Sequence, residues 1–197
     1  MFVKICGLGD RKAVQAAVAA GADAVGFVFF EKSPRNITPE KAARLAVDVP
    51  ENVRRVAVML HPDSVLWDEV SDALRPDVLQ TDSGDFSYLN VAEHIEKWPV
   101  LREGAVSEGD TLPDTFVYEG TRSGEGQTVD WNSAAAIARR GQMILAGGLT
   151  IENVANAISK VAPYGVDVSS AVESSPGEKD VAKIAAFVAA AKAADRN

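Results

Sequence analysis

The feature that most constrains the fold of this chain is the repeated alternation of short apolar runs with alanine-rich or amphipathic stretches. Eight such βα units recur along the sequence. The predicted strands are five to seven residues long and rich in Val, Ile, Leu or Phe; they are Phe2–Cys6, Ala24–Phe30, Arg54–Leu60, Asp77–Thr81, Val100–Gly104, Thr115–Glu119, Met143–Gly147 and Gly165–Ser169. Helical stretches fit between them.

Eight βα units predict a closed barrel rather than an open sheet. The strands recur at roughly 20–30 residues, a spacing that matches βα units. A doubly wound open sheet is the alternative. The weakest helix is expected in the segment SEGDTLPD, which has little helical periodicity. We therefore expect an α/β fold, with residues 1–197 forming a single domain, a (β/α)₈ TIM barrel.

Composition excludes several classes of function. The net charge of −8 disfavours a nucleic-acid partner, which requires a basic surface, and no apolar run is long enough to span a membrane. A single cysteine excludes an internal disulfide framework, and two histidines, His61 and His94, give little support to a metal site or a serine triad. The chain begins with a strand rather than a leader segment, so we expect a cytoplasmic protein.

Small and polar residues after the last two predicted strands indicate a phosphate site. Gly147 and Gly148 follow one strand, and Thr150 is placed to cap the next helix. Ser169 and Ser170 end the following strand. In a barrel these two loops commonly bind phosphate through backbone N–H groups. The alternative interpretation is structural, with the glycines forming a tight turn and the serines capping a helix.

The only cysteine, Cys6, lies at the end of the first predicted strand. Alternation along the strand puts it on the same face as Lys4, and an interior face would direct the thiol toward a bound ligand. A nearby cation would make such a thiol a useful general base. The alternative is a small buried hydrophobic residue. Lys4 would tune Cys6, pair with an interior carboxylate such as Asp167, or extend out of the barrel.

Asp130 and Arg35 are two further candidates, each with a structural alternative. Asp130 precedes the helical segment WNSAAAIARR and either caps that helix or, if Asn132 or Ser133 caps it, faces the pocket. Arg35 precedes a helix that Thr38 caps, and its guanidinium is suited to binding a carboxylate. A surface charge is the alternative role of Arg35.

Five segments taken in order resemble the phosphoribosylanthranilate isomerase family, a group of barrel enzymes of tryptophan biosynthesis. The segments are KICGL, GFVF followed by SPR, SGEGQTVDW, LAGGLTIENV and GVDVSSAVESSPGEKD. The resemblance covers almost the whole chain. It implies a ribulose-phosphate-binding barrel that acts without a cofactor or metal, has a small-molecule substrate, and is a monomer or a homodimer.

The resemblance also implies a reaction and a set of residue roles. The reaction is the Amadori rearrangement of N-(5′-phosphoribosyl)anthranilate to 1-(2-carboxyphenylamino)-1-deoxyribulose 5-phosphate. Cys6 corresponds to the general base, Asp130 to the general acid, and Arg35 to the residue that binds the anthranilate carboxylate. Phosphate contacts correspond to the Gly147–Gly148 and Ser169–Ser170 segments. In this scheme Asp130 must carry a proton when it acts.

Several positions depart from the family pattern. The family's Gln-Leu-His-Gly run is replaced here by a sequence with Asp82 in place of histidine, and the aspartate that usually ends the sixth strand is Glu119. Glu125 lies in the loop that is usually glycine-rich, and Ala171 stands where glycine is usual. We expect these changes to modify substrate binding and to leave the reaction unchanged.

Two competing functions are considered. One is another phosphosugar barrel isomerase or synthase, such as the histidine-pathway isomerase or indole-glycerol-phosphate synthase, which uses a carboxylate or lysine where this chain has Cys6. The other is a catalytically silent phosphosugar-binding barrel. Loss of activity in a Cys6→Ser variant would distinguish thiol-dependent catalysis from both.

Overall fold

The strands form a closed parallel barrel. The computed structural model describes residues 1–107, 109–121 and 128–194. Within these residues each strand of an eight-stranded sheet pairs with the next, and the last pairs with the first. The strands are β1 (Phe2–Cys6), β2 (Ala24–Phe29), β3 (Arg54–Met59), β4 (Val78–Asp82), β5 (Glu96–Arg102), β6 (Thr115–Glu119), β7 (Gln142–Leu145) and β8 (Gly165–Val168). The predicted barrel is confirmed, and the open-sheet alternative is wrong.

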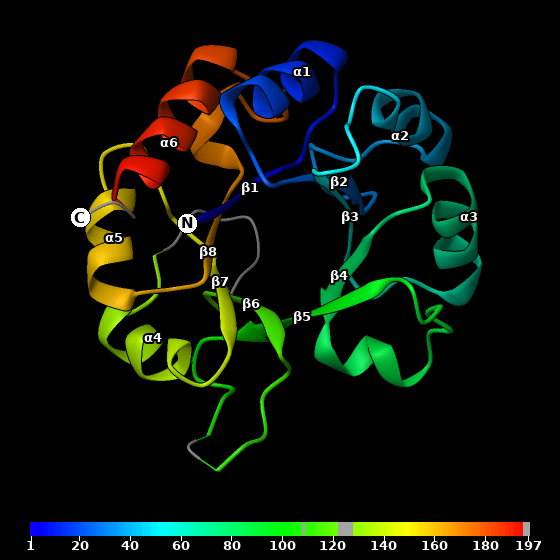
Figure 1. The fold of residues 1–197 in the computed structure, drawn as a ribbon. Coiled ribbons are helices and arrows are strands. Elements are labelled where there is room, and N and C mark those ends of the chain that lie inside the picture. Colours follow the sequence, from blue (N-terminus) through cyan, green and yellow to red (C-terminus); the bar gives the residue numbers. More distant parts are fainter. Residues whose placement is uncertain (108, 122–127, 195–197) are drawn as a thin grey trace.

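Helices surround the barrel as an outer ring (Figure 1). In the described part of the chain there are six α-helices, α1 (Arg11–Ala20), α2 (Pro39–Ala46), α3 (Ser64–Leu74), α4 (Trp131–Ala138), α5 (Val154–Val161) and α6 (Val181–Ala194). A short 3₁₀ helix, η1 (Ser83–Ser87), connects β4 to β5. The described residues between β5 and β6 hold no helix, as the weak periodicity of SEGDTLPD predicts. After β8 come the 3₁₀ helix η2 (Ser170–Val172) and a small hairpin of β9 (Glu173–Ser175) and β10 (Glu178–Lys179).

Side-chain caps start most of the helices on the carboxyl-terminal side of the barrel. In each case an oxygen of the capping residue accepts a hydrogen bond from a backbone N–H in the first turn, which satisfies a donor that the helix leaves free. The capping residues are Asp10, Thr38, Asp63, Asp130 and Asp180. Because each cap follows a strand or the β9–β10 hairpin, the amino-terminal ends of these helices lie around the mouth of the barrel.

Two apolar layers hold the barrel together. The interior layer consists of inward-facing residues of six strands: Ala24, Val56, Val78, Trp98, Val100, Val117, Ile144 and Ala146. A larger layer lies between the strands and the helices and includes the fully buried side chains of Trp67, Phe116 and Phe187. Burial of each large side chain contributes about 1.5–3 kcal/mol. Toward the carboxyl ends of the strands, polar residues such as Gln80, Glu119 and Asp167 also line the barrel interior.

The two ends of the described chain meet at one seam of the barrel. β8 pairs with β1, and α6 packs beside α1 (Figure 1). Lys192 of α6 donates to the backbone oxygen of Met1 at 2.9 Å and to Asp23 at 2.6 Å. The seam therefore joins the first strand to the last strand and the last helix. Among the described residues, no helix has the length and apolar character needed to cross a membrane.

Six of the eight strands differ from the sequence prediction at one or both ends, by one to four residues, and the start of β5 differs most. β5 begins at Glu96, four residues before the predicted start. The prediction missed these residues because the charged side chains and Pro99 in the sequence EKWPVLR are unusual in strands. α5 begins at Val154, so Thr150 does not cap it directly. Thr150 instead exchanges hydrogen bonds with Asn153 in the turn before the helix, with N–O distances of 2.8 and 3.3 Å.

Candidate active site

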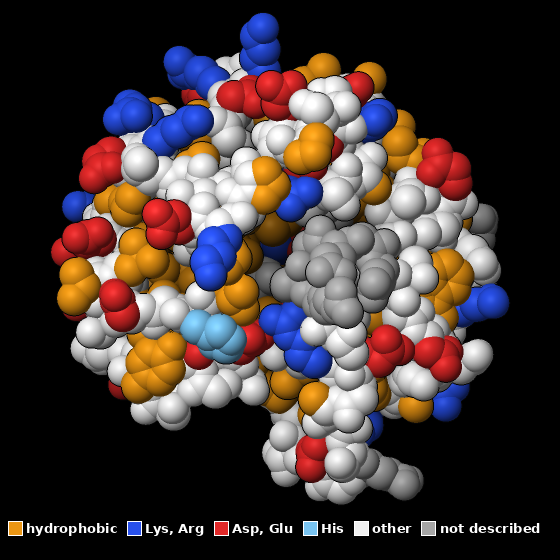
Figure 2. All heavy atoms as spheres, turned by 180° about the vertical axis from the view of Figure 1, so that it is seen from behind, with side chains coloured by type: hydrophobic (Ala, Val, Ile, Leu, Met, Phe, Trp, Pro, Cys, Tyr) orange, Lys and Arg blue, Asp and Glu red, His pale blue; other side chains and the backbone are white. Residues whose placement is uncertain are grey.

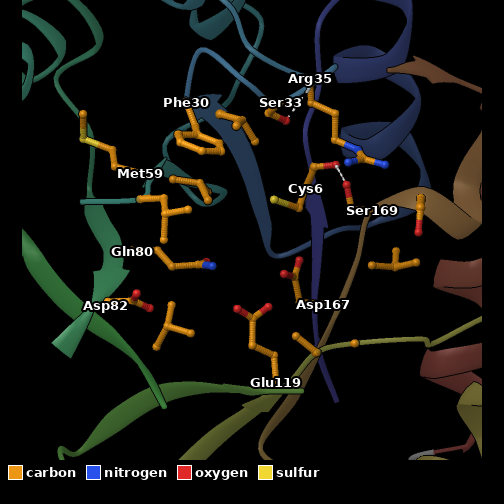
Figure 3. A pocket seen from close by; sticks show the side chains of 18 of the residues that line it. Cys6, Phe30, Ser33, Arg35, Met59, Gln80, Asp82, Glu119, Asp167 and Ser169 are labelled. Carbon is orange, nitrogen blue, oxygen red and sulfur yellow. Dashed lines mark hydrogen bonds between the residues drawn. The ribbon is translucent and has the colours of Figure 1, made fainter. Parts of the chain in front are cut away.

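A cavity of about 320 Å³ opens at the carboxyl ends of the strands. Such a volume is at the lower end of the roughly 300–1,000 Å³ typical of small-molecule sites. All eight strands or their following loops contribute to its lining, and Figure 3 shows side chains directed into it from opposite walls. The charged residues of the lining are three cations and three acids: Lys32, Arg35, Arg102, Asp82, Glu119 and Asp167. The cavity is therefore balanced in charge although the chain is acidic.

The outer surface also has positive side chains near a hollow. Figure 2 shows a hollow near the centre of one face of the molecule, with lysine and arginine side chains around it. Positive side chains close to a hollow favour an anionic ligand even on a protein whose net charge is −8.

Cys6 lies in this cavity beside a buried ion pair. The Nζ atom of Lys4 is 2.9 Å from Oδ1 of Asp167, its neighbour across β1 and β8. Lys4 is fully buried, and Cys6 is 6 % exposed. Of the three interpretations of Lys4, pairing with Asp167 is observed. Burial raises the pKa of the Cys6 thiol, and the Asp167 carboxylate raises it further, while the charge of Lys4 opposes both effects.

Gly26 makes room for this arrangement. It is the neighbour of Cys6 across β1 and β2. A Cβ atom on Gly26 would lie 3.1 Å from the Cys6 sulfur and 3.3 Å from Cε of Lys4. The thiol of Cys6 and the side chain of Lys4 therefore both pack against Gly26, where a side chain is absent. A larger residue at this position would displace one of them.

Arg35 lines the cavity and is held by a carboxylate from the far end of the chain. Its Nε and Nη2 atoms donate to the two oxygens of Glu173 at 2.7 and 2.9 Å. Lys179 donates to Glu173 at 2.7 Å and to the backbone oxygen of Ser169 at 2.8 Å. The Arg35 side chain is 12 % exposed, so the surface-charge interpretation is wrong. Arg35 packs over Gly7, where a Cβ atom would approach its Cδ to 2.5 Å.

The predicted phosphate segments line the same cavity as Cys6 and Arg35. Gly147 and Gly148 have φ values of 88° and 61°, a left-handed conformation that favours glycine. Ser169 lies next to Cys6 (Figure 3), and its Oγ donates to the Cys6 backbone oxygen at 3.1 Å. Ser170 begins η2 and is exposed. The tight-turn interpretation of the two glycines is thus observed, and it leaves their backbone facing the cavity.

Asp130 is placed differently from the other candidates. It caps α4: Oδ1 accepts a hydrogen bond from the backbone N–H of Asn132 at 2.8 Å. Of the two alternatives, capping of α4 by Asp130 is observed, and capping by Asn132 or Ser133 is not. Asp130 is exposed and is not among the residues that line the cavity. Its backbone N–H donates to Glu103 at 2.7 Å.

Asp82 and Glu119, two departures from the family pattern, share one arginine. Arg102, the neighbour of Glu119 across β5 and β6, donates to Glu119 and also donates to Asp82 at 2.6 Å. All three line the cavity. Glu119 keeps the charge of the usual aspartate, and the charge that Asp82 adds is paired with Arg102. Glu125 lies outside the described residues.

His61 connects this group to the surface. Its Nε2 is 3.2 Å from Asp82, and its Nδ1 is 3.0 Å from Asp85. The hydrogen bond to Asp85 raises the pKa of His61, and burial acts in the other direction. His61 adopts a φ of 47°, which is uncommon for a residue with a side chain.

The backbone at Ala171, the remaining departure from the family pattern, does not require glycine. The described non-glycine residues with positive φ are His61, Arg75 and Ala162, and Ala171 is not one of them. Its backbone is therefore in a conformation open to any residue.

Sequence reasoning missed Lys179, Glu173 and Arg102 as site residues. The first two are part of the segment ESSPGEK, but their meeting with Arg35 depends on how the β9–β10 hairpin folds back. Arg102 is the middle residue of the predicted strand Val100–Gly104 and the last residue of β5. It lies two positions after the inward-facing Val100, and that alternation is the signal that would have identified it.

A second hollow, of about 420 Å³, lies at the opposite end of the barrel. It is lined by strand starts, including Phe2, Trp98 and Tyr164, whose rings pack against one another, and by the Arg54–Glu96 ion pair. In this fold, residues at that end serve stability, whereas catalytic residues lie at the carboxyl ends of the strands.

Comparisons with known proteins agree on one family. The family model described as N-(5′-phosphoribosyl)anthranilate (PRA) isomerase matches residues 3–190. An N-(5′-phosphoribosyl)anthranilate isomerase from Pelobacter propionicus is 37 % identical, with 96 % of this chain and 95 % of the relative covered. One from Geobacter sp. is 40 % identical, with 96 % and 97 % covered. A solved phosphoribosyl anthranilate isomerase from Thermotoga maritima is 30 % identical, has a TM-score of 0.84 and aligns over 98 % of this chain and 99 % of its own.

Proposed function

Because the chain belongs to the phosphoribosylanthranilate isomerase family, we infer that it converts N-(5′-phosphoribosyl)anthranilate to 1-(2-carboxyphenylamino)-1-deoxyribulose 5-phosphate, a step of tryptophan biosynthesis. A solved phosphoribosyl anthranilate isomerase that is 33 % identical, with a TM-score of 0.82, is a complex with the reduced form of that product. The ligand of that relative supports the same type of ligand for this cavity.

One observation carries the assignment of residues: Cys6, Arg35 and both proposed phosphate segments line the same cavity. They come from β1, the loop after β2, and the loops after β7 and β8. An anion-binding end, a guanidinium and a thiol within one cavity match the three parts of the substrate, which are its phosphate, its carboxylate and its reacting carbon.

The phosphate is assigned to the loops after β7 and β8. Gly147 and Gly148 expose backbone groups where a side chain would block an oxyanion, and Ser169 and Ser170 add hydroxyl groups. The ammonium group of Lys179 donates a hydrogen bond to the backbone oxygen of Ser169, and its positive charge favours an anion at this loop. Burial lowers the pKa of Lys179, and its contact with Glu173 limits this effect.

Arg35 is assigned to the anthranilate carboxylate. Its Nε and Nη2 atoms are engaged by Glu173, which fixes the plane of the guanidinium. A fixed guanidinium binds a carboxylate with less loss of side-chain entropy than a mobile one. The apolar lining near it, with Val28, Phe30 and Met59, suits the aromatic ring.

The reaction needs an acid and a base. Asp130 donates a proton to the ribose ring oxygen as the C1′–O bond breaks, which gives an iminium ion. The iminium acidifies the C2′ proton, and Cys6 removes that proton as a thiolate. The resulting enolamine takes up a proton at C1′ and its C2′ hydroxyl gives up a proton, which yields the ketone. Cys6 acts as a base and forms no covalent bond to the substrate.

The positions of Cys6 and Asp130 support this scheme unequally. Cys6 is inside the cavity, whereas Asp130 is at the start of α4, following the loop that leaves β6. For Asp130 to act, its side chain must exchange the N–H of Asn132 for the substrate oxygen. Apo geometry of this kind does not exclude a catalytic acid, because catalytic hydrogen bonds often form only with substrate bound.

A fluorescence assay of freshly generated phosphoribosylanthranilate tests the proposal. Wild type is expected to consume it, and Cys6→Ser and Asp130→Asn, shown to be folded by circular dichroism, are expected to be slower by roughly a thousandfold, in line with the loss of a general acid or base. An exposed lysine variant, Lys12→Met, is the control and should match wild type. A folded wild type without turnover would contradict the activity, and an active Cys6→Ser would contradict the role of the thiol.

A further inference from the structure

Lys4 is a buried cation whose surroundings are not explained by packing alone. It is 0 % exposed, and its neighbour across β1 and β2 is Ala24, a member of the apolar layer inside the barrel. A buried charge is expensive unless it is paired and hydrogen-bonded. Lys4 has its ion pair with Asp167 at 2.9 Å, but within the described residues its Nζ forms no hydrogen bond of acceptable geometry, and neither does Oδ1 of Asp167.

The same cation is next to the proposed base. Lys4 and Cys6 are two positions apart on β1, and both side chains pack against Gly26. Asp167 is the neighbour of Lys4 across the seam and lines the cavity with Cys6, and Figure 3 shows it on the same side of the cavity as the thiol. Three ionisable groups of alternating character, a thiol, an ammonium and a carboxylate, therefore form one buried group.

We propose that Lys4 is a positioning residue for the reaction, and that the Lys4–Asp167 pair sets how readily Cys6 loses its thiol proton. Lys4 provides the positive charge that stabilises the thiolate, and Asp167 holds that charge in place and limits its effect. The inference rests on the proposed role of Cys6 as a base. It assigns Lys4 and Asp167 a function that burial and packing do not require.

The charges around the thiol determine the expected signs. The groups that act on Cys6 are Lys4 from β1, Asp167 from β8 and Lys179 from β10. Removing Lys4 takes away the nearest cation, so the thiol should hold its proton to higher pH. Removing the charge of Asp167 leaves Lys4 with Cys6 as its nearest acid, so the thiol should lose its proton at lower pH. The two changes are expected to act in opposite directions.

The single cysteine of the chain makes this measurable without substrate. Iodoacetamide alkylates only the thiolate, with iodide as the leaving group, so the rate of alkylation against pH reports the titration of Cys6. We would compare wild type, Lys4→Met and Asp167→Asn between about pH 6 and pH 10, a range that extends on both sides of the ordinary thiol pKa of about 8.5. Lys12→Met, which removes an exposed charge on α1, is the matched control.

At pH 7.5 we expect Lys4→Met to be alkylated about tenfold more slowly than wild type and Asp167→Asn about tenfold faster, which corresponds to shifts of about one unit in opposite directions. Lys12→Met should follow wild type. Coincident profiles, or shifts of the same sign in both variants, would overturn the proposal.

The double variant Lys4→Met/Asp167→Asn covers the case in which Lys4→Met does not fold, because it leaves no unpaired buried charge. It should be alkylated more slowly than Asp167→Asn alone, and an equal rate would overturn the role of Lys4. Turnover is measured in parallel. If wild type is active but neither substitution changes the alkylation profile of Cys6, only the inference about Lys4 and Asp167 fails. If Cys6→Ser is fully active, the proposed role of Cys6 as a base fails, and this inference fails with it.

Discussion

Glu173 binds the guanidinium of Arg35 through both carboxylate oxygens, at 2.7 and 2.9 Å, across 138 positions of the chain. One of these oxygens also accepts a hydrogen bond from Lys179. The Glu173 side chain is 4 % exposed and that of Lys179 is fully buried. A single carboxylate therefore forms ion pairs with two cations at the wall of the cavity.

Replacement of Glu173 should destabilise the protein. Glu173→Gln removes the charge and leaves two largely buried cations without the carboxylate that both contact, a change that typically costs about 3–5 kcal/mol for a buried pair. Urea-induced unfolding should show a loss in that range. Glu31→Gln, at an exposed position in the loop after β2, is the control and should change stability by less than about 0.5 kcal/mol. Equal losses in the two variants would contradict a special role for Glu173.

Gly7 is expected to be required for more than its backbone conformation. Gly7 and Gly21 have φ values of 76° and 87°, but a Cβ at Gly7 would meet Arg35 at 2.5 Å, whereas one at Gly21 would have open space. Gly21→Ala should cost about 1–2 kcal/mol for the left-handed conformation alone. Gly7→Ala should cost about 1–3 kcal/mol more because of the clash. Thermal or urea unfolding measures both losses, and similar values would show that Arg35 moves aside freely.

Asp130 has a structural role that can be separated from its proposed catalytic role. Asn is as good an N-cap as Asp, so Asp130→Asn should keep stability within about 0.5 kcal/mol, whereas Asp130→Ala should lose about 1 kcal/mol. Turnover should fall by roughly a thousandfold in both, since neither residue donates a proton as a carboxylic acid does. Unfolding curves and the fluorescence assay on the same preparations test this. If Asp130→Asn retained activity, capping would be the only role left to Asp130.

His61 should make stability depend on pH. Its hydrogen bond to Asp85 raises the pKa of His61 in the folded protein above the value of about 6.5 in the unfolded chain. The stabilisation is therefore fully present below about pH 6.5 and is lost as pH rises through the folded pKa. Wild type should lose stability relative to His61→Asn between pH 6 and pH 9, and Asn tolerates the left-handed backbone at this position.

The control for this experiment is His94→Asn, which changes the other histidine, an exposed residue in the connection before β5. It should leave the difference between pH 6 and pH 9 as in wild type. A His61→Asn variant whose stability follows wild type at both pH values would show that the contacts of His61 with Asp82 and Asp85 contribute nothing.

Much of the barrel was predictable from the sequence. The predicted ends of β1 and β6 agree with the structure to the residue because β-branched and aromatic residues fill these strands. β5 was misplaced at its start because Glu96, Lys97 and Pro99 are unusual in a strand, although Trp98 between them faces the barrel interior. Local propensity gave no signal for a strand that forms because its neighbours require it.

The candidate site was predictable where it depends on position along a strand. Cys6, Gly147 and Ser169 follow or end strands, and the carboxyl ends of all strands of a barrel meet. The partners of these residues depend on long-range geometry. Glu173 reaches Arg35 only because the β9–β10 hairpin folds back over the loop after β2, where Gly177 leaves room for Pro34. No spacing in the sequence specifies that contact.

The seam between β1 and β8 has a consequence for protein synthesis. Ser169 follows Cys6 by 163 positions, so Cys6 leaves the ribosome well before the residue whose hydroxyl donates to its backbone oxygen. A nascent chain that has not yet reached β8 and the hairpin after it has the thiol but lacks Asp167, Glu173 and the second proposed phosphate loop. The complete site therefore forms only after β8 and the β9–β10 hairpin have been translated, and a product truncated before β8 would carry Cys6 without them.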